Sequence, residues 1–309
     1  MVTQTNEQAL EACIEKALTG TCRERLRVDG LGVSEANDRF RGGHLYWLGE
    51  SGDFDREFAV DRRHFWRFLE TTQADELSKI TDRPQWKRLI LERLNCKIQK
   101  EGIVHVLKSG LRIDNAHFTL FYSRPYSAIN PEVAERFEQN IFSVTRQVSY
   151  STSNPLKSID MVIFLNGISV ATLELKNAWT GQSTYHAMKQ YREDRGDGHK
   201  TSYLWQDILS RQSLAAIIEH FTKLVGEKGN DPLKKKRLFF PRYHQLEVVR
   251  NIIADVRANG VGRTYLIQHS AGSGKSNSIT CAAYQLIEVY PENGDRPIFS
   301  RPSWLSPAR

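Results

Sequence analysis

The sequence predicts an α/β protein, and three observations carry this prediction. An almost wholly apolar β-hairpin centres on Asn166-Gly167, and segments with helical spacing of apolar residues precede and follow it. A strand-like segment, a glycine-rich turn and a helical segment then follow one another at 265–286. We therefore expect a first domain over residues 1–225, a linker at 226–237, and an incomplete second α/β lobe at 238–309.

Composition narrows the class of protein without identifying it. Of 309 residues, 40% are hydrophobic and 26% are charged, which is typical of a globular protein, and no apolar segment is long enough to span a membrane. The N-terminus lacks the features of a secretory leader, so we expect a cytoplasmic protein. The net charge of +7 is compatible with a polyanionic partner but does not specify one. Four cysteines without C-x-x-C spacing indicate neither a zinc site nor disulfides: Cys13, Cys22, Cys96 and Cys281.

Helical spacing and turn residues define the elements around the hairpin. Asn130-Pro131 is a typical helix start, with Asn as the N-cap and Pro in the first turn. The segment 226–237 breaks both periodicities, which is typical of a linker. The other predicted elements are helices at 6–18, 61–72, 86–100 and 183–193, and strands at 117–122 and 142–150.

Three charged residues interrupt the hairpin, namely Asp160 in its first strand and Glu174 and Lys176 in its second. Charged side chains are rarely buried without a partner or a metal. Two carboxylates can hold Mg²⁺, and a neighbouring ammonium group can orient or deprotonate an attacking water. The pattern therefore predicts a Mg²⁺ site for phosphodiester hydrolysis, with a structural ion pair at the end of the hairpin as the alternative.

The register of the hairpin provides a structural test of this site. A regular two-residue turn at Asn166-Gly167 would pair Asp160 with Leu173 and direct Glu174 to the opposite face. If Asp160 and Glu174 share a metal, the pairing of the two strands must shift by one residue, for example through a three-residue loop or a β-bulge. We therefore predict an irregularity in this hairpin.

The segment IDMVIFLNGISVATLELKN (159–177) closely resembles the PD-(D/E)xK nuclease core in the motor subunits of type I restriction enzymes. The similarity extends upstream over 64–77 and downstream over 177–194. The resemblance implies a mixed sheet flanked by helices, and cleavage of double-stranded DNA by Asp160, Glu174 and Lys176. It also implies Mg²⁺ as a cofactor, and methyltransferase and specificity subunits as partners.

Two features of the resembled family are less clear in this chain. A Gln-x-x-x-Tyr pattern follows the nuclease core in that family, whereas here Ala187 lies four residues before Tyr191 and the nearest glutamine is Gln190. Many such nucleases also use an acidic residue on the first helix. Glu11 and Glu15 are candidates for that role, and a solvated helix face explains them equally well.

A second motif, HSAGSGKS at 269–276, has the sequence context of a P-loop. The residues 265–268 read as a short buried strand, and a helical segment follows the motif. We expect backbone amides around Gly272, Ser273 and Gly274 to hold phosphate oxygens of ATP, with Lys275 reaching the β- and γ-phosphates. Ser276 is then the expected ligand of the nucleotide-bound Mg²⁺.

The residues 241–245 (PRYHQ) resemble the adenine-reading segment that precedes the P-loop in superfamily 2 motors. By that resemblance Gln245 reads the adenine edge, while the alternative is that Tyr243 and Gln245 simply begin a helix. Only residues 276–309 follow Lys275, whereas a RecA-like lobe needs roughly a hundred or more residues. We therefore expect an incomplete translocase whose C-terminal segment is a truncation or an out-of-frame end.

Three functions remain open from the sequence alone. The first is a Mg²⁺-dependent DNA endonuclease with an ATP-binding P-loop from an incomplete translocase. The second is a catalytically inactive fragment that binds only DNA or other subunits, and the third is a free ATP-binding module.

Overall fold

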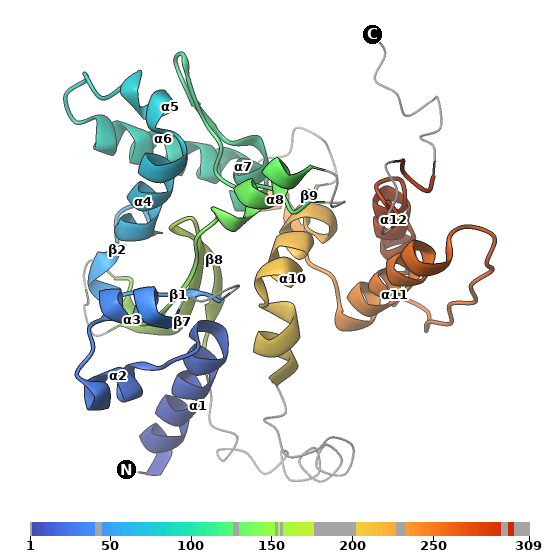
Figure 1. Ribbon diagram of the computed structural model, residues 1–309, viewed down its shortest axis with the longest axis horizontal. Coiled ribbons are helices and arrows are strands. Elements are labelled where there is room, and N and C mark those ends of the chain that lie inside the picture. The colour runs from blue at the N-terminus through green and yellow to red at the C-terminus, as the bar shows by residue number, and fades with distance from the viewer. Residues whose placement is uncertain are drawn as a thin grey trace. The chain divides into compact units, whose positions relative to one another are not determined.

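The computed structural model describes residues 2–40, 45–125, 130–151, 154, 157–175, 202–226, 233–291 and 296–299. The chain divides into two compact units, each made of several segments (Figure 1). Unit 1 comprises 1–98, 109–121 and 139–214, and unit 2 comprises 99–108, 122–138 and 215–309. The domain limits expected from the sequence, at 225 and 238, stay a prediction.

A six-stranded sheet forms the centre of unit 1, in the order β1-β6-β7-β8-β3-β2. Its strands β1 and β6 run parallel and its other pairs are antiparallel, so the sheet is mixed. The predicted mixed α/β architecture is thereby confirmed. The strands are β1 (Trp47–Leu48), β2 (Phe54–Asp55), β3 (Val60–Asp61), β6 (Phe142–Ser149), β7 (Ser158–Leu165) and β8 (Ile168–Leu173).

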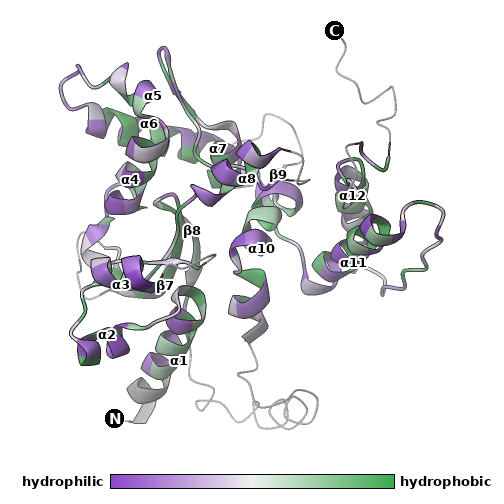
Figure 2. Cartoon of the chain, in the orientation of Figure 1, coloured by the Kyte–Doolittle hydropathy of each residue, from purple (hydrophilic) through white to green (hydrophobic). Residues whose placement is uncertain are grey.

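The core of unit 1 lies on these strands, because β7 is apolar along most of its length and β6 contributes the buried side chains of Phe142, Val144 and Val148. Figure 2 shows β7 and β8 as hydrophobic segments within a largely hydrophilic exterior. The side chains of residues 161–168 are all buried, including Phe164. Burial on both faces is expected for strands without alternating polarity. A charged side chain at the end of such a strand therefore needs a partner, a ligand or solvent.

Helix α4 (Arg62–Thr72) follows β3 directly, and Asp61 is its N-cap. The Asp61 Oδ1 atom accepts a hydrogen bond of 3.0 Å from the His64 backbone amide, which satisfies one of the free amides of the first turn. The His64 Nδ1 atom lies 2.7 Å from Asp61 Oδ2, and both side chains are buried. The buried face of α4 also carries Phe65, Phe68 and Leu69.

Two further helices of unit 1 confirm the sequence expectations, whereas the predicted helix at 183–193 lies outside the described residues. The predicted helix at 6–18 is α1 (Val2–Thr19), and the one at 86–100 is α6 (Trp86–Glu101). The predicted strand at 117–122 is shorter than expected, because only β5 (Ala116–Phe118) is extended and paired. The remaining elements are α2 (Arg23–Asp29), α3 (Val33–Phe40), α5 (Ala74–Ser78), β4 (Leu111–Ile113) and the π-helical turn η3 (Leu204–Ile208).

Unit 2 contains a small antiparallel ladder of β9 (Lys223–Val225) and β10 (Arg237–Phe239). The predicted linker at 226–237 therefore connects two paired strands, although 227–232 lie outside the described residues. Helix α8 (Pro131–Glu138) begins as predicted, with Asn130 Oδ1 accepting the Glu132 amide at 3.1 Å. The other elements are α7 (Ile103–Ser109), α10 (Arg211–Ala216), η4 (Ile217–Phe221), η5 (Leu233–Lys235), α11 (Tyr243–Asn259) and α12 (Lys275–Leu286), with α7 and α10 ending or beginning in unit 1.

The prediction of a buried strand at 265–268 is wrong. These residues form no strand, and Leu266 is 95% exposed. A P-loop strand is buried only when neighbouring strands pair with it, and in the described part of unit 2 no strand pairs with 265–268. Apolar composition predicts a strand here, but its burial depends on the rest of a sheet.

Candidate active site

The hairpin of β7 and β8 has the irregularity that a shared carboxylate site requires. Its two-residue turn pairs Leu165 with Ile168, with positive φ at both Asn166 (51°) and Gly167 (78°), as expected for Asn-Gly. The register shifts between Ile163 and Phe164, whose partners are Ala171 and Ser169, so that Val170 is the additional residue of a β-bulge. The predicted irregularity is therefore confirmed.

The bulge changes which residues of the two strands lie opposite each other. The last paired residues of the hairpin are Met161 and Leu173, with Asp160 next on β7 and Glu174 next after the end of β8. Cross-strand partners share a face of the sheet. A regular turn would set Asp160 opposite Leu173, whereas this register, continued by one position, sets it opposite Glu174.

The Asp160 carboxylate is held by two donors. Its Oδ2 atom accepts a hydrogen bond of 2.6 Å from the backbone amide of Leu175, and its Oδ1 atom lies 3.5 Å from Gln147 Nε2. The side chain of Asp160 is half-buried. These contacts orient the carboxylate toward the end of β8.

Glu174 is exposed and has no hydrogen bond or ion pair within the described residues. Its carboxylate is therefore available to a ligand. Lys176, the third residue of the predicted constellation, lies outside the described residues, as do Gln190 and Tyr191.

Gln147 on β6 connects helix α1 to Asp160. It lies opposite Asp160 in the β6–β7 register and has a positive φ of 52°. Its Nε2 atom donates a hydrogen bond of 2.6 Å to Glu11 Oε1, and its Oε1 atom accepts one of 2.9 Å from Ser158. One amide group thus joins Glu11 to Asp160.

A buried cluster of charges supports this connection. Arg146 on β6 donates to Glu11 Oε2 at 2.7 Å, to Glu15 Oε2 at 3.1 Å and to Glu24 Oε1 at 2.9 Å. Glu11 and Glu15 are 2% and 0% exposed, so a solvated helix face does not explain them. Arg23 contributes its backbone amide, 2.9 Å from Glu15 Oε2.

The carboxylates of this cluster differ in their electrostatics. Burial raises the pKa of Glu15 above its ordinary value, and hydrogen bonds and charge from Arg23 and Arg146 only partly offset this. Burial alone would raise the pKa of Glu24 too, but hydrogen bonds from its own backbone amide and from Arg146 outweigh this and lower the pKa. Burial opposes the charge of Arg146 itself, yet Glu11, Glu15 and Glu24 raise its pKa.

The donor chemistry of the two opposed carboxylates fits Mg²⁺, which takes oxygen ligands and is commonly bound by one or two carboxylates with waters and phosphate. In the part of the chain that the structure describes, no group of three or more His, Cys, Asp or Glu side chains is arranged to hold a metal ion. Glu11 is engaged with Arg146 and Gln147, and a metal site formed by Asp160 and Glu174 stays a prediction.

In the second motif, two glycines have a left-handed backbone just before a helix. Gly272 and Gly274 have positive φ values of 73° and 84°, and α12 begins at Lys275. The Lys275 ammonium group donates to the backbone oxygens of His269 at 3.1 Å and Ser270 at 3.2 Å. Ser276 is exposed in the first turn of α12.

Gln245 contacts this loop directly. Its Nε2 atom donates to the backbone oxygens of Ser273 at 3.0 Å and Gly274 at 3.1 Å, and its Oε1 atom accepts from the Arg242 amide at 2.8 Å. The side chain is buried, and a Cβ atom at Gly274 would collide with it. Reading an adenine edge would require these bonds to open, so that role stays a prediction.

Sequence reasoning missed Arg146, Gln147 and Glu24. Arg146 occupies a position of β6 where the alternation of Phe142, Val144 and Val148 predicts an apolar residue. This was the available signal, since buried arginines need carboxylate partners. Its partners on α1 and α2 lie more than a hundred positions away in the chain, so no local pattern identifies them.

The mixed sheet, with its paired carboxylates at the ends of β7 and β8, is consistent with an α/β nuclease-like fold. Residues 66–214 match the family model described as the N terminus of type I restriction enzyme R proteins. This match includes Asp160, Glu174 and Lys176 and ends before the P-loop motif. The match supports an R-subunit N-terminal region over these residues and provides no support for a motor.

No curated protein and no solved structure matches the chain. None of the described helices combines the length and apolar character needed to cross a membrane.

Proposed function

We propose that this chain is the Mg²⁺-dependent DNA endonuclease of a type I restriction system. The observation that carries the proposal is the bulge at Val170, which sets Asp160 opposite Glu174 on one face of the hairpin. The match of residues 66–214 to the R-protein N terminus supports DNA as the substrate.

Each residue then has a distinct task. Asp160 and Glu174 hold the metal, and the Leu175 amide keeps the Asp160 carboxylate aimed at it. Lys176, two positions after Glu174, orients or deprotonates the attacking water. Bound Mg²⁺ supplies charge stabilisation for the phosphate during in-line displacement. Glu11 and Gln147 act on Asp160 as positioning residues.

The decisive experiment is cleavage of plasmid DNA with Mg²⁺ by the Asp160→Asn, Glu174→Gln and Lys176→Ala variants. We expect a loss of more than about a hundredfold, because even residues that only orient metal ligands contribute about 10- to 100-fold. Asp38→Asn is the matched control, since Asp38 is exposed and lies outside the site. Calorimetric titration with Mn²⁺ gives a second readout, in which Asp160→Asn and Glu174→Gln weaken binding.

Unchanged cleavage by Asp160→Asn and Lys176→Ala would exclude the proposed site. Absence of cleavage by the unaltered chain, together with binding of DNA or of methyltransferase and specificity subunits, would favour the alternative of an inactive binding module. These subunits are the partners that the R-protein match implies.

We also propose that the loop at 269–276 binds ATP. Two glycines with positive φ and the N-terminus of α12 support a phosphate-binding backbone. Lys275 and Ser276 are then the contacts to phosphate and to nucleotide-bound Mg²⁺. Lys275→Ala should abolish binding of a fluorescent ATP analogue, with Lys234→Ala as the control; equal binding by both variants would exclude this role.

A further inference from the structure

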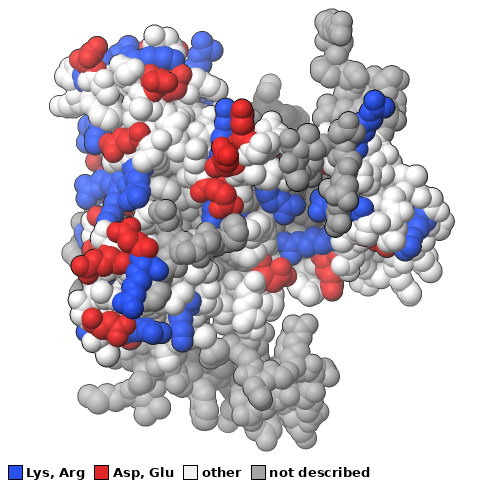
Figure 3. Space-filling view, viewed as in Figure 1, with Lys and Arg blue, Asp and Glu red and all other residues white. Residues whose placement is uncertain are grey.

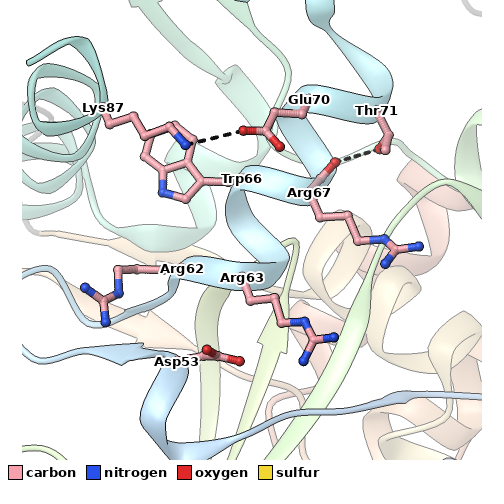
Figure 4. Close-up of a pocket in the computed structure, with 8 residues that line it drawn as sticks. All are labelled: Asp53, Arg62, Arg63, Trp66, Arg67, Glu70, Thr71 and Lys87. Carbon is pink, nitrogen blue, oxygen red and sulfur yellow. Dashed lines mark hydrogen bonds and ion pairs between the residues drawn. The ribbon is translucent and has the colours of Figure 1, made fainter. Parts of the chain in front are cut away.

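A hollow of 580 Å³ lies on unit 1 along the exposed face of α4, remote in sequence from the carboxylate hairpin (Figure 4). Arg62 and Trp66, and Arg63 and Arg67, are each four residues apart, so all four side chains lie on one face of the helix. Lys87 at the start of α6 completes the basic lining. Figure 3 shows Lys and Arg side chains gathered over this part of unit 1.

The charges of this hollow do not cancel. Its two lining carboxylates are Asp53 and Glu70, and Glu70 is engaged by Lys87 at 3.4 Å. Burial raises the pKa of Asp53, and the charges of Asp61 and Glu50 add to this. Four basic side chains line the hollow against these two carboxylates. The lining therefore retains an excess of positive charge.

Two of the guanidinium groups are available to an anion. Arg62 is exposed and has no carboxylate partner among the residues described. Arg67 stacks over the Trp47 ring at 4.4 Å, which fixes its position without neutralising it. Arg63, by contrast, forms an ion pair with Glu50, with 3.4 Å between Nη1 and Oε1.

Aromatic rings distinguish this hollow from an ordinary solvated helix face. Trp66 is half-buried and packs edge-on against Trp86, with ring centroids 5.5 Å apart. Lys87 lies over both rings, at 5.0 Å and 5.2 Å from their centroids. Guanidinium groups interleaved with indoles are typical of surfaces that bind nucleic-acid backbone, where cations contact phosphates and rings pack against sugars or bases.

The hollow and the carboxylate hairpin belong to the same sheet-centred unit. Strand β3, which leads into α4, pairs with β8 through Val60 and Ile168, and Glu174 follows Ile168 by six residues. Six residues of extended strand cover roughly 20 Å, the length of about six nucleotides of one DNA strand. A duplex longer than this is therefore the appropriate ligand for a test that includes both places.

We propose that Arg62, Arg67, Lys87 and Trp66 form a second contact for the DNA substrate, binding phosphodiester backbone away from the cleavage site. The proposal rests on the proposed nuclease function for the identity of the ligand. Its role is to hold and orient duplex DNA, and it includes no chemical step.

The test is fluorescence anisotropy of a labelled duplex of about 30 base pairs. Metal is left out so that binding is measured apart from cleavage. The salt concentration is about 50 mM, at which phosphate contacts are strong. The variants are Arg62→Gln/Arg67→Gln and Arg62→Glu/Arg67→Glu. Arg56→Glu/Arg93→Glu is the matched control, because both residues are exposed, lie outside the hollow and change the net charge equally. Near-ultraviolet circular dichroism checks that the tryptophan cluster is intact.

We expect the Gln pair to weaken binding roughly tenfold or more and to lower the slope of log affinity against log salt by about 2. The control should remain within about twofold of the unaltered chain. Three outcomes would each overturn the proposal. The control could lose as much affinity as the Glu pair, the Gln pair could bind DNA as well as the unaltered chain, or the unaltered chain could fail to bind DNA. Failure of the nuclease function has a separate signature, namely cleavage that survives Asp160→Asn.

Discussion

Arg146 and Glu11 form a buried ion pair, with 2.7 Å between Nε and Oε2, that joins the first helix to the central sheet. The same guanidinium also pairs with Glu15, which has a second cation, Arg23, at 3.5 Å, so Arg146 connects two buried carboxylates. Breaking a buried pair costs more than forming it contributes, because the remaining charges stay desolvated.

We therefore predict that Arg146→Met lowers the free energy of unfolding by about 3–5 kcal/mol. Arg25→Met is the control, because Arg25 is 55% exposed and pairs with Asp29 on its own helix. Its effect should stay within about 0.5 kcal/mol. Urea unfolding followed by far-ultraviolet circular dichroism measures both, and similar losses in the two variants would contradict the structural role of Arg146.

The second prediction concerns pH and separates two carboxylates of this cluster. The pKa of Glu15 in the folded protein is raised above its ordinary 4.5. Protonated Glu15 therefore stabilises the folded protein below pH 4.5, and this contribution is lost as the pH rises through the folded-state pKa. Glu15→Gln should therefore gain stability relative to the unaltered chain as the pH rises. The pKa of Glu24 is lowered, so its contribution is present above pH 4.5 and is lost as the pH falls through the folded pKa.

Glu24→Gln should accordingly lose stability at neutral pH, and this loss should shrink in acid. Thermal melts of both variants from about pH 3 to about pH 8 measure the opposite trends. Parallel trends in the two variants would show that the signs of the pKa shifts are wrong.

The hairpin and its bulge show how far the sequence predicts this site. Asn166-Gly167 indicates the turn through backbone preference alone, and the chemistry of two carboxylates on one metal predicts the register shift that the structure contains. Both arguments are local, since they depend on residues close together in the chain.

The Arg146 cluster could not be predicted in the same way, because it depends on how α1 packs against β6. Arg146 reads as an isolated charge in a strand, and Glu11 reads as one acid on a helix face. The error at 265–268 has a related cause: Leu266 and its neighbours have strand composition, yet burial depends on partner strands. Tertiary contacts decide both cases.

The third prediction tests the tight turn of the hairpin. Gly167 has a φ of +78°, and a Cβ atom there would lie 2.6 Å from the Asp61 backbone oxygen and would also collide with Phe65. Gly167→Ala should destabilise unit 1 by more than the roughly 1–2 kcal/mol that a left-handed conformation alone costs a non-glycine residue.

Gly30→Ala is the control for the backbone effect, because Gly30 has a φ of +65° and a Cβ atom there would have no other atom within 4 Å. The difference between the two variants in urea unfolding isolates the steric collision. If both lose the same free energy, the close approach of the turn to α4 is not a packing constraint.

The fourth prediction concerns the positioning of Asp160. Gln147→Leu removes the amide that joins Glu11 to Asp160, and cleavage should fall by about 10- to 100-fold, as for groups that orient metal ligands. A purely structural role would lower stability without moving the pH profile of cleavage, whereas loss of a donor to Asp160 should shift it. Gln206→Leu, at an exposed position, should change neither rate nor profile.

The last prediction concerns the loop that Gln245 contacts. Gln245→Leu removes one donor from each of the Ser273 and Gly274 carbonyls, which keep His244 Nε2 and the backbone amides of α12 as partners. The change should therefore cost about 0.5–1.5 kcal/mol for each hydrogen bond lost. Hydrogen exchange should therefore quicken at the amides of Asn277 and Ser278, which bond to Gly274. Gln285→Leu is the control, since its amide contacts Cys281 within α12. Unchanged exchange in Gln245→Leu would show that the loop keeps its conformation without these hydrogen bonds, and would leave the Gln245 amide open to a nucleotide base.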